Sequence, residues 1–113
     1  MKSKILALSK NEEFKNLLKQ KKLSNKYVTI FFGSLINKNT KKLNISFVAK
    51  KKIGNAVKRN KIKRRLRNIF NEAIKKISIK FNYSYLVIAK STMLNNEYKK
   101  IKETLFQDLE KIR

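Results

Sequence analysis

The stretch from residue 14 to residue 71 carries 18 Lys and Arg side chains and no carboxylate. Salt bridges within the stretch therefore cannot offset its charge, and the whole chain of 113 residues has a formal net charge of +23. Any fold must bring these like charges together, and their repulsion opposes folding unless a polyanion neutralises them. An apolar fraction of 42% is sufficient for one core. We therefore expect residues 1–113 to form a single domain whose natural partner is a nucleic acid.

The residue types that the chain lacks restrict its chemistry. It contains no Cys and no His, which excludes disulfides, thiolate nucleophiles and the usual zinc sites, and removes the commonest general base. We therefore expect no catalytic residue and no metal ligand in the protein itself. No run approaches the length of a membrane span, about 18 apolar residues, and residues 1–10 have too short an apolar centre for a secretory signal. These features predict a cytoplasmic protein that makes no membrane contact.

Local patterns predict a first helix followed by strands. Ser9 and Glu12 have the spacing of a capping box, so the helix should begin there. Runs rich in β-branched and aromatic residues predict strands at 27–32 and 43–49. A further strand is predicted at 85–90, and its nearly continuous apolar sequence indicates the interior of a sheet.

Two more helices are predicted from apolar residues that recur at helical spacing. The longer one should begin near residue 56, after Gly54 and Asn55, and the last should be capped by Asn95 or Asn96. The core-facing positions of the longer helix lie within about 100° of one another. They are Ile62, Leu66, Ile69, Phe70, Ala73 and Ile77. The predicted order of elements is αββαβα, an α+β fold.

The longer helix is also where the chain places its arginines. Only five of the 30 basic residues are Arg, and four of those five fall within residues 59–67. A guanidinium can grip a phosphate through two parallel hydrogen bonds, whereas a lysine offers one movable charge. Asn60, Lys63, Arg64 and Arg67 follow at helical spacings of three, four and seven, which places them on one ridge. A solvated helix face is the alternative, but such faces usually mix charges of both signs, and we favour a nucleic-acid-binding surface.

The segment GNAVKRNKIKRRLR at 54–67 closely resembles the signature of the protein subunit of bacterial ribonuclease P. The matching positions are Gly54, Ala56, Val57, Arg59, Asn60, Lys63, Arg64 and Arg67. The resemblance extends over nearly the whole chain, from 8–14 through 51–53 to 87–90. One departure is Lys61, where the family usually has a second arginine, so the charge is kept and the planar fork is lost.

This resemblance implies a fold and an activity. The fold would be a two-layer α/β sandwich with a mixed sheet and a left-handed βαβ crossover, of the ribosomal protein S5 domain 2-like type. The protein would bind the catalytic RNA subunit of ribonuclease P, and that RNA, with bound Mg²⁺, would remove the 5′ leader from precursor tRNA. The protein would raise substrate and metal affinity, and no obligate protein partner is implied. The residues implied to bind the RNA subunit are Arg59, Asn60, Lys61, Lys63, Arg64 and Arg67.

The resemblance also implies a cleft for the leader of precursor tRNA, between the first helix and the sheet. Its lining would be Phe14, Leu18, Phe31, Lys51, Lys52 and Lys90. Exposed aromatic rings can stack on unpaired bases. Phe14 could instead pack in the core. The run Lys50, Lys51 and Lys52 could be a solvated loop, but its place between a strand and the arginine-rich helix favours a phosphate contact. Leu18 stands where the family often has an aromatic residue, and Phe31 where a tyrosine is common.

Two other classes of protein remain as alternatives. A small basic ribosomal or nucleoid-type RNA- or DNA-binding protein would fit the composition, but it would not stimulate precursor tRNA cleavage by a catalytic RNA. A metal-dependent nuclease would cut without any RNA subunit and would need clustered carboxylates. The only carboxylates in the first 71 residues are Glu12 and Glu13, which argues against the nuclease.

Overall fold

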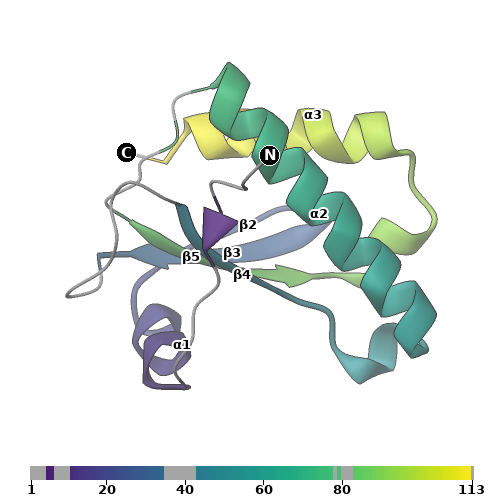
Figure 1. Cartoon of the computed structure of the whole chain (residues 1–113), viewed down its shortest axis with the longest axis horizontal. Coiled ribbons are helices and arrows are strands. Elements are labelled where there is room, and N and C mark those ends of the chain that lie inside the picture. The colour runs from purple at the N-terminus through teal and green to yellow at the C-terminus, as the bar shows by residue number, and fades with distance from the viewer. Residues whose placement is uncertain (1–4, 7–10, 35–42, 78, 80–82, 113) are drawn as a thin grey trace.

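The computed structural model describes residues 5–6, 11–34, 43–77, 79 and 83–112, with backbone only for 5–6 and 11–14. One sheet forms the middle of the molecule, with α2 and α3 on one face and α1 on the other (Figure 1). The three helices are α1 (Asn11–Leu18), α2 (Ala56–Lys76) and α3 (Tyr98–Glu110). Two short 3-10 helices, η1 (Lys51–Ile53) and η2 (Ser91–Leu94), lie before α2 and before α3.

The sheet has five strands in the order β1-β4-β5-β3-β2. The three predicted strands are confirmed, each within two residues of its predicted bounds, as β3 (Val28–Gly33), β4 (Leu43–Val48) and β5 (Ser84–Ala89). Two short strands at the edges, β1 (Ile5–Leu6) and β2 (Lys21–Ser24), were not predicted. The mainly exposed side chains of β2 give no alternating apolar pattern, so its sequence resembles an ordinary charge run.

β5 is the central strand and organises the sheet. It runs parallel to β4 and antiparallel to β3, with Phe31 of β3 paired with Leu86 of β5. β4, α2 and β5 therefore form the predicted βαβ unit. The sheet and the layer of α2 and α3 make the predicted two-layer α/β sandwich, a ribosomal protein S5 domain 2-like arrangement, and α1 covers part of the opposite face. The left hand of the crossover stays a prediction.

The main core lies between the sheet and the layer of α2 and α3. Five of the six predicted core positions of α2 are buried, and Ile77, the sixth, is half-buried beyond the helix end. From α3 the core receives Ile101, Leu105 and Leu109. Phe47 of β4 packs on Phe70 of α2 with ring centroids 5.5 Å apart. Burial of this apolar stripe fixes which side of α2 remains exposed.

Helix starts were predicted with mixed success. The side chain of Asn55 accepts a hydrogen bond of 3.0 Å from the backbone N–H of Lys58, so Asn55 caps α2. The predicted cap of α3 was wrong, because α3 starts after Glu97. Asn96 instead donates its side-chain N–H to the carbonyl of Thr92 at 2.6 Å, within the turn that precedes α3. Ser9, the predicted cap of α1, lies outside the described residues.

Candidate nucleic-acid interface

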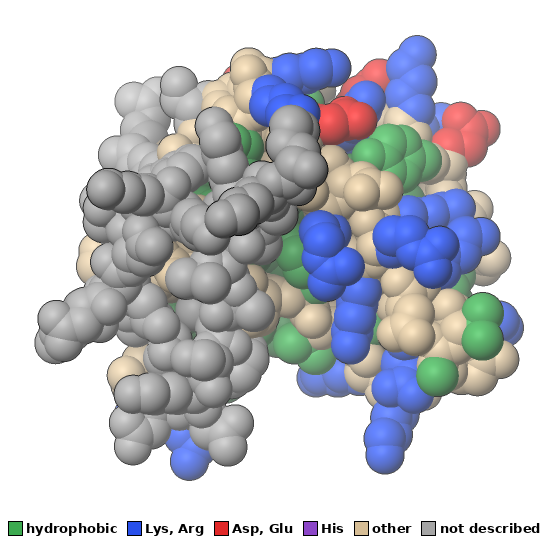
Figure 2. Space-filling view, viewed as in Figure 1, with side chains coloured by type: hydrophobic (Ala, Val, Ile, Leu, Met, Phe, Trp, Pro, Cys, Tyr) green, Lys and Arg blue, Asp and Glu red, His purple; other side chains and the backbone are tan. Residues whose placement is uncertain are grey.

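The exposed side of α2 carries the basic ridge, which we define as Asn60, Lys63, Arg64 and Arg67. Lys63 is half-buried and the other three side chains are exposed. In the view of Figure 2, Lys and Arg side chains lie over α2, and the acidic side chains visible on this face gather towards α3. Because the apolar side of α2 is held against the sheet, the ridge faces outward.

Ion pairs do not neutralise the ridge within the described part of the chain. The pairs found there join Lys102 to Glu72 at 3.1 Å and Lys111 to Asp108 at 3.5 Å. Both pairs involve α3 or the residue that follows it. The positive charge of the ridge therefore remains uncompensated, as expected of a surface that binds a polyanion.

The remaining two side chains predicted to bind an RNA subunit lie beside the ridge. Lys61 is exposed. Arg59 is half-buried, and its Nε atom is fully covered and has no hydrogen-bond partner among the described residues. Nε of Arg59 thus faces the protein, and only the outer part of the guanidinium is open to a partner.

A second basic surface is a groove of about 560 Å³ at the end of β5. Thr29 and Ile88, which pair across β3 and β5, line its sheet side. Lys50 and Lys52 line it from η1 and the residue before it, and Lys90 completes it. The structure therefore brings together two of the predicted leader-binding lysines, Lys52 and Lys90.

The other lysines near this groove differ from the prediction in detail. Lys51 is exposed on η1 but is not among the residues that line the groove, whereas Lys50, which was predicted only as a member of the basic run 50–52, does line it. The ammonium of Lys90 donates hydrogen bonds to Ser24 Oγ at 2.9 Å and to the carbonyl of Asn25 at 2.6 Å. Lys90 is therefore tied to the turn between β2 and β3, and Lys50 and Lys52 are the exposed cations of the groove.

Of the three apolar residues predicted for the leader cleft, Phe31 lies on the sheet face that α1 partly covers. Phe31 is half-buried on this face and packs with Leu17 of α1 and Leu86 of β5. Leu18 is 49% exposed at the end of α1. The side chain of Phe14 lies outside the described residues, so its predicted role is not tested. Phe31 shares its sheet face with the groove residue Thr29, two positions earlier on β3, because side chains alternate along a strand.

Two features were missed by sequence reasoning. Arg65 belongs to the arginine cluster, but it falls outside the spacing that defines the ridge. Arg65 is half-buried and donates from Nη1 to the carbonyl of Met93 at 3.4 Å. Val57 is 77% exposed on the first turn of α2, three positions before Asn60 and therefore at one end of the ridge. The arginine count pointed to the first feature. Val57 was noted only as a matching position of the segment at 54–67, and its apolar side chain gave no sign that it would be exposed.

One tyrosine between α2 and α3 has an altered acidity. Burial, and then the negative charge of Glu72, raise the pKa of Tyr98 above its ordinary value of 10.0, and Lys102 opposes them. The Lys102 ammonium also lies 5.8 Å from the centroid of the Tyr98 ring. This cluster joins the two helices and lies apart from the ridge.

The residues described here do not provide a metal site of their own. Among them, no group of three or more His, Cys, Asp or Glu side chains could hold a metal ion. The prediction that Mg²⁺ is bound mainly by an RNA subunit is untested. None of the helices in the described segments is both long and apolar enough to span a membrane.

The fold and its two surfaces define a small, highly basic α+β sandwich protein. The family model for ribonuclease P matches residues 3–113. The chain therefore belongs to the ribonuclease P protein family, as the resemblance at 54–67 predicted.

Relatives and solved structures agree with this assignment. The chain is 39% identical over 109 residues to the ribonuclease P protein component of Fusobacterium nucleatum, covering 92% of this chain and 86% of the relative. It is 35% identical over 102 residues to that of Carboxydothermus hydrogenoformans, covering 87% and 83%. The RNase P protein of Staphylococcus aureus superimposes with a TM-score of 0.76 at 26% identity, covering 94% of this chain and 93% of the other. That of Thermotoga maritima gives 0.80 at 24% identity, covering 96% and 98%, and supports the fold alone.

Proposed function

We propose that the protein is the protein component of a bacterial ribonuclease P and assists a catalytic RNA subunit in removing the 5′ leader from precursor tRNA. The observation that carries this proposal is the basic ridge, which faces outward and forms no ion pair with a carboxylate among the described residues. The ridge also lies within the region that the family model matches. In this proposal the ridge, together with Arg59 and Lys61, binds the RNA subunit. Arginine forks would fix the RNA backbone, and the amide of Asn60 would add hydrogen bonds without charge.

The second surface is proposed to bind the leader. Lys50 and Lys52 would neutralise leader phosphates at the groove, and Phe31 would offer an apolar ring edge or face to an unpaired base. Lys90 would act mainly by holding the turn before β3 in place, since its ammonium already has two acceptors. Leu18 and Phe14 are proposed to extend this surface along α1.

Positive charge at both surfaces would also lower the repulsion between two RNA molecules brought together. Each neutralised phosphate releases condensed counterions, which favours association and makes it salt-dependent. We propose that this effect raises the affinity for substrate and for the magnesium ions held by the RNA. Bond cleavage in this proposal is the work of the RNA, and the protein acts in the cytoplasm without an obligate protein partner.

Reconstitution tests the proposal directly. The purified protein is added to a bacterial ribonuclease P RNA and a leader-bearing tRNA at low magnesium, and cleavage is followed with and without each component. We expect leader removal to require the RNA and to be accelerated by the protein. Binding without acceleration would instead identify a general polyanion binder, and cleavage by the protein alone would identify a nuclease.

A further inference from the structure

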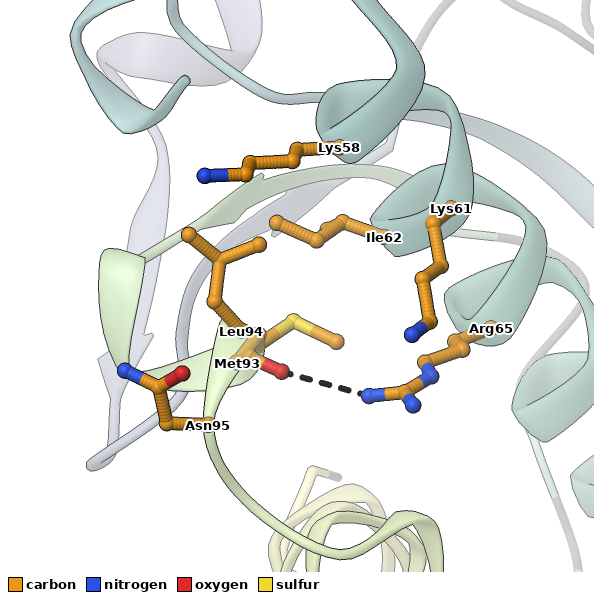
Figure 3. Close-up of a pocket in the computed structure, with 7 residues that line it drawn as sticks. All are labelled: Lys58, Lys61, Ile62, Arg65, Met93, Leu94 and Asn95. Atoms are coloured by element: carbon orange, nitrogen blue, oxygen red, sulfur yellow. Dashed lines mark hydrogen bonds between the residues drawn. The ribbon is translucent and has the colours of Figure 1, made fainter. Parts of the chain in front are cut away.

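A separate notch lies between α2 and η2, beside the basic ridge (Figure 3). It has a volume of about 260 Å³. Three basic side chains reach it from successive turns of α2, namely Lys58, Lys61 and Arg65. The opposite side is formed by η2 and the residue after it. The notch is therefore built from two segments that are distant in the sequence.

The charges of the notch are all positive. Lys58 and Lys61 are exposed, Arg65 is half-buried, and none of the described residues that line the cavity is a carboxylate. Three like charges around one small space repel one another, and a bound anion would relieve that repulsion. The chemistry of the walls thus selects a negatively charged group.

Arg65 is oriented before any ligand binds. Its Nη1 donates to the carbonyl of Met93 at 3.4 Å, and Figure 3 shows this bond reaching across the notch from α2 to η2. A guanidinium has five N–H donors, so this contact leaves others for a ligand. A fork held in place by the protein loses less entropy on binding than a free side chain does.

The floor of the notch is apolar. Ile62 and Met93 are buried, and Leu94 is half-buried beside them. A fully hydrated ion gains nothing from such a surface, whereas a phosphate ester presents a sugar to it. The size and lining therefore suit one phosphate group with its ribose rather than a helix or an extended strand.

Lys61 and Arg65 contribute to the same side of the notch. Lys61 and Arg65 are four residues apart, one turn along the same side of α2, and both line the notch. Arg65 thus places a planar fork in the space where Lys61 supplies charge alone.

We propose that this notch binds one phosphodiester group of an RNA backbone, with Arg65 supplying the fork and Lys58 and Lys61 supplying charge. This proposal rests on the proposed function and specifies a contact with the catalytic RNA that is additional to the ridge. The ribose of the same nucleotide lies against Leu94.

The test compares affinities for the catalytic RNA over a range of salt concentrations. Arg65→Gln should weaken binding by about tenfold and lower the salt slope by about one. Lys75→Gln is the matched control, because Lys75 is an exposed cation in the last turn of α2 and does not line the notch. It should change affinity by less than about twofold. Melting curves of both variants check folding, and Lys58→Gln removes an exposed notch charge if Arg65→Gln is unstable.

Exchanging arginine and lysine between positions 65 and 61 separates the contribution of the planar guanidinium from that of the positive charge. Arg65→Lys should bind the catalytic RNA more weakly but with the same salt slope. Adding Lys61→Arg to this variant should restore most of the lost affinity. Equal affinity of Arg65→Gln and Lys75→Gln, with a folded protein, would overturn the notch proposal. The proposal would also be overturned if Arg65→Gln reduced the thermal stabilisation of the protein by inorganic phosphate but left its affinity for the catalytic RNA unchanged. If the unaltered protein fails to bind the catalytic RNA at all, the proposed function itself fails, which is a distinguishable result.

Discussion

Phe31 and Phe32 are adjacent on β3 and face opposite sides of the sheet, which gives a matched test of the leader-binding surface. Phe31→Leu keeps most of the apolar volume that packs against Leu17 and Leu86, and removes the aromatic ring. Stacking of one base on an aromatic ring contributes ~1 to 3 kcal/mol. We therefore expect the affinity for leader-bearing precursor tRNA to fall by about 5- to 150-fold. Affinity for mature tRNA and assembly with the RNA subunit should not change.

Phe32→Leu is the control. Phe32 is 7% exposed on the core side, with its ring centroid 5.8 Å from that of Tyr83 and 6.4 Å from that of Tyr85. Its replacement should lower the melting temperature and reduce all activities together, because it disturbs a packed core. Because Phe31 is only half-buried, Phe31→Leu should lower the free energy of unfolding less, by ~1 kcal/mol or below. Binding of leader-bearing and mature tRNA is measured beside the melting temperature. If Phe31→Leu behaves like Phe32→Leu, with equal losses for both substrates, our assignment of Phe31 is wrong.

Three further predictions concern the basic ridge and the contact between α2 and α3. Arg64→Ala and Arg67→Ala should each weaken assembly with the RNA subunit, because each removes one cation that neutralises a phosphate. The slope of log affinity against log salt concentration should fall by about 0.7 to 0.9. An unchanged slope in a salt titration would contradict this. Asn60→Ala should weaken assembly without altering the salt slope, since an amide releases no counterion; an effect confined to the melting temperature would make Asn60 a structural residue. The pKa of Tyr98 is higher in the folded chain than in the unfolded chain, so protonation of this tyrosine favours the folded state. The stability that it contributes is complete below pH 10 and is lost as the pH rises towards the raised pKa. Tyr98→Phe should therefore make the alkaline fall in melting temperature shallower, and parallel curves for the two proteins would refute the assignment.

The sequence predicted the parts of the fold that depend on local apolar patterns. The bounds of β3, β4 and β5 and the buried side of α2 follow directly from those patterns. β2 could not be predicted, because its residues Lys21–Ser24 become a strand only by pairing with β3. The predicted cap of α3 was wrong because the helix starts after Glu97, and the side chain of Asn96 donates to a carbonyl of the preceding turn.

The candidate site was predictable to a similar extent. The ridge was found because its residues share one helix and one spacing. The roles of Lys90 and Arg65 depend on contacts with Asn25 and Met93, which are 65 and 28 positions away in the sequence. Such contacts leave no periodic signal, and only the folded chain shows that Lys90 is tied to a turn and that Arg65 reaches across a notch.

The short connection between the groove and α2 has a consequence for how the two RNA ligands influence one another. Lys50 and Lys52 belong to the groove, and α2 begins only four residues after Lys52, at Ala56. Like charges on adjoining segments repel one another to the extent that salt does not screen them, so an anion bound at either surface would lower the repulsion at the other. If the ridge binds the RNA subunit and the groove binds the leader, as proposed, the two binding events would be linked by a favourable coupling free energy, and thermodynamic reciprocity would require the same factor in both directions. A longer leader should thus tighten the hold of the protein on its RNA subunit, and the RNA subunit should strengthen leader binding by an equal ratio.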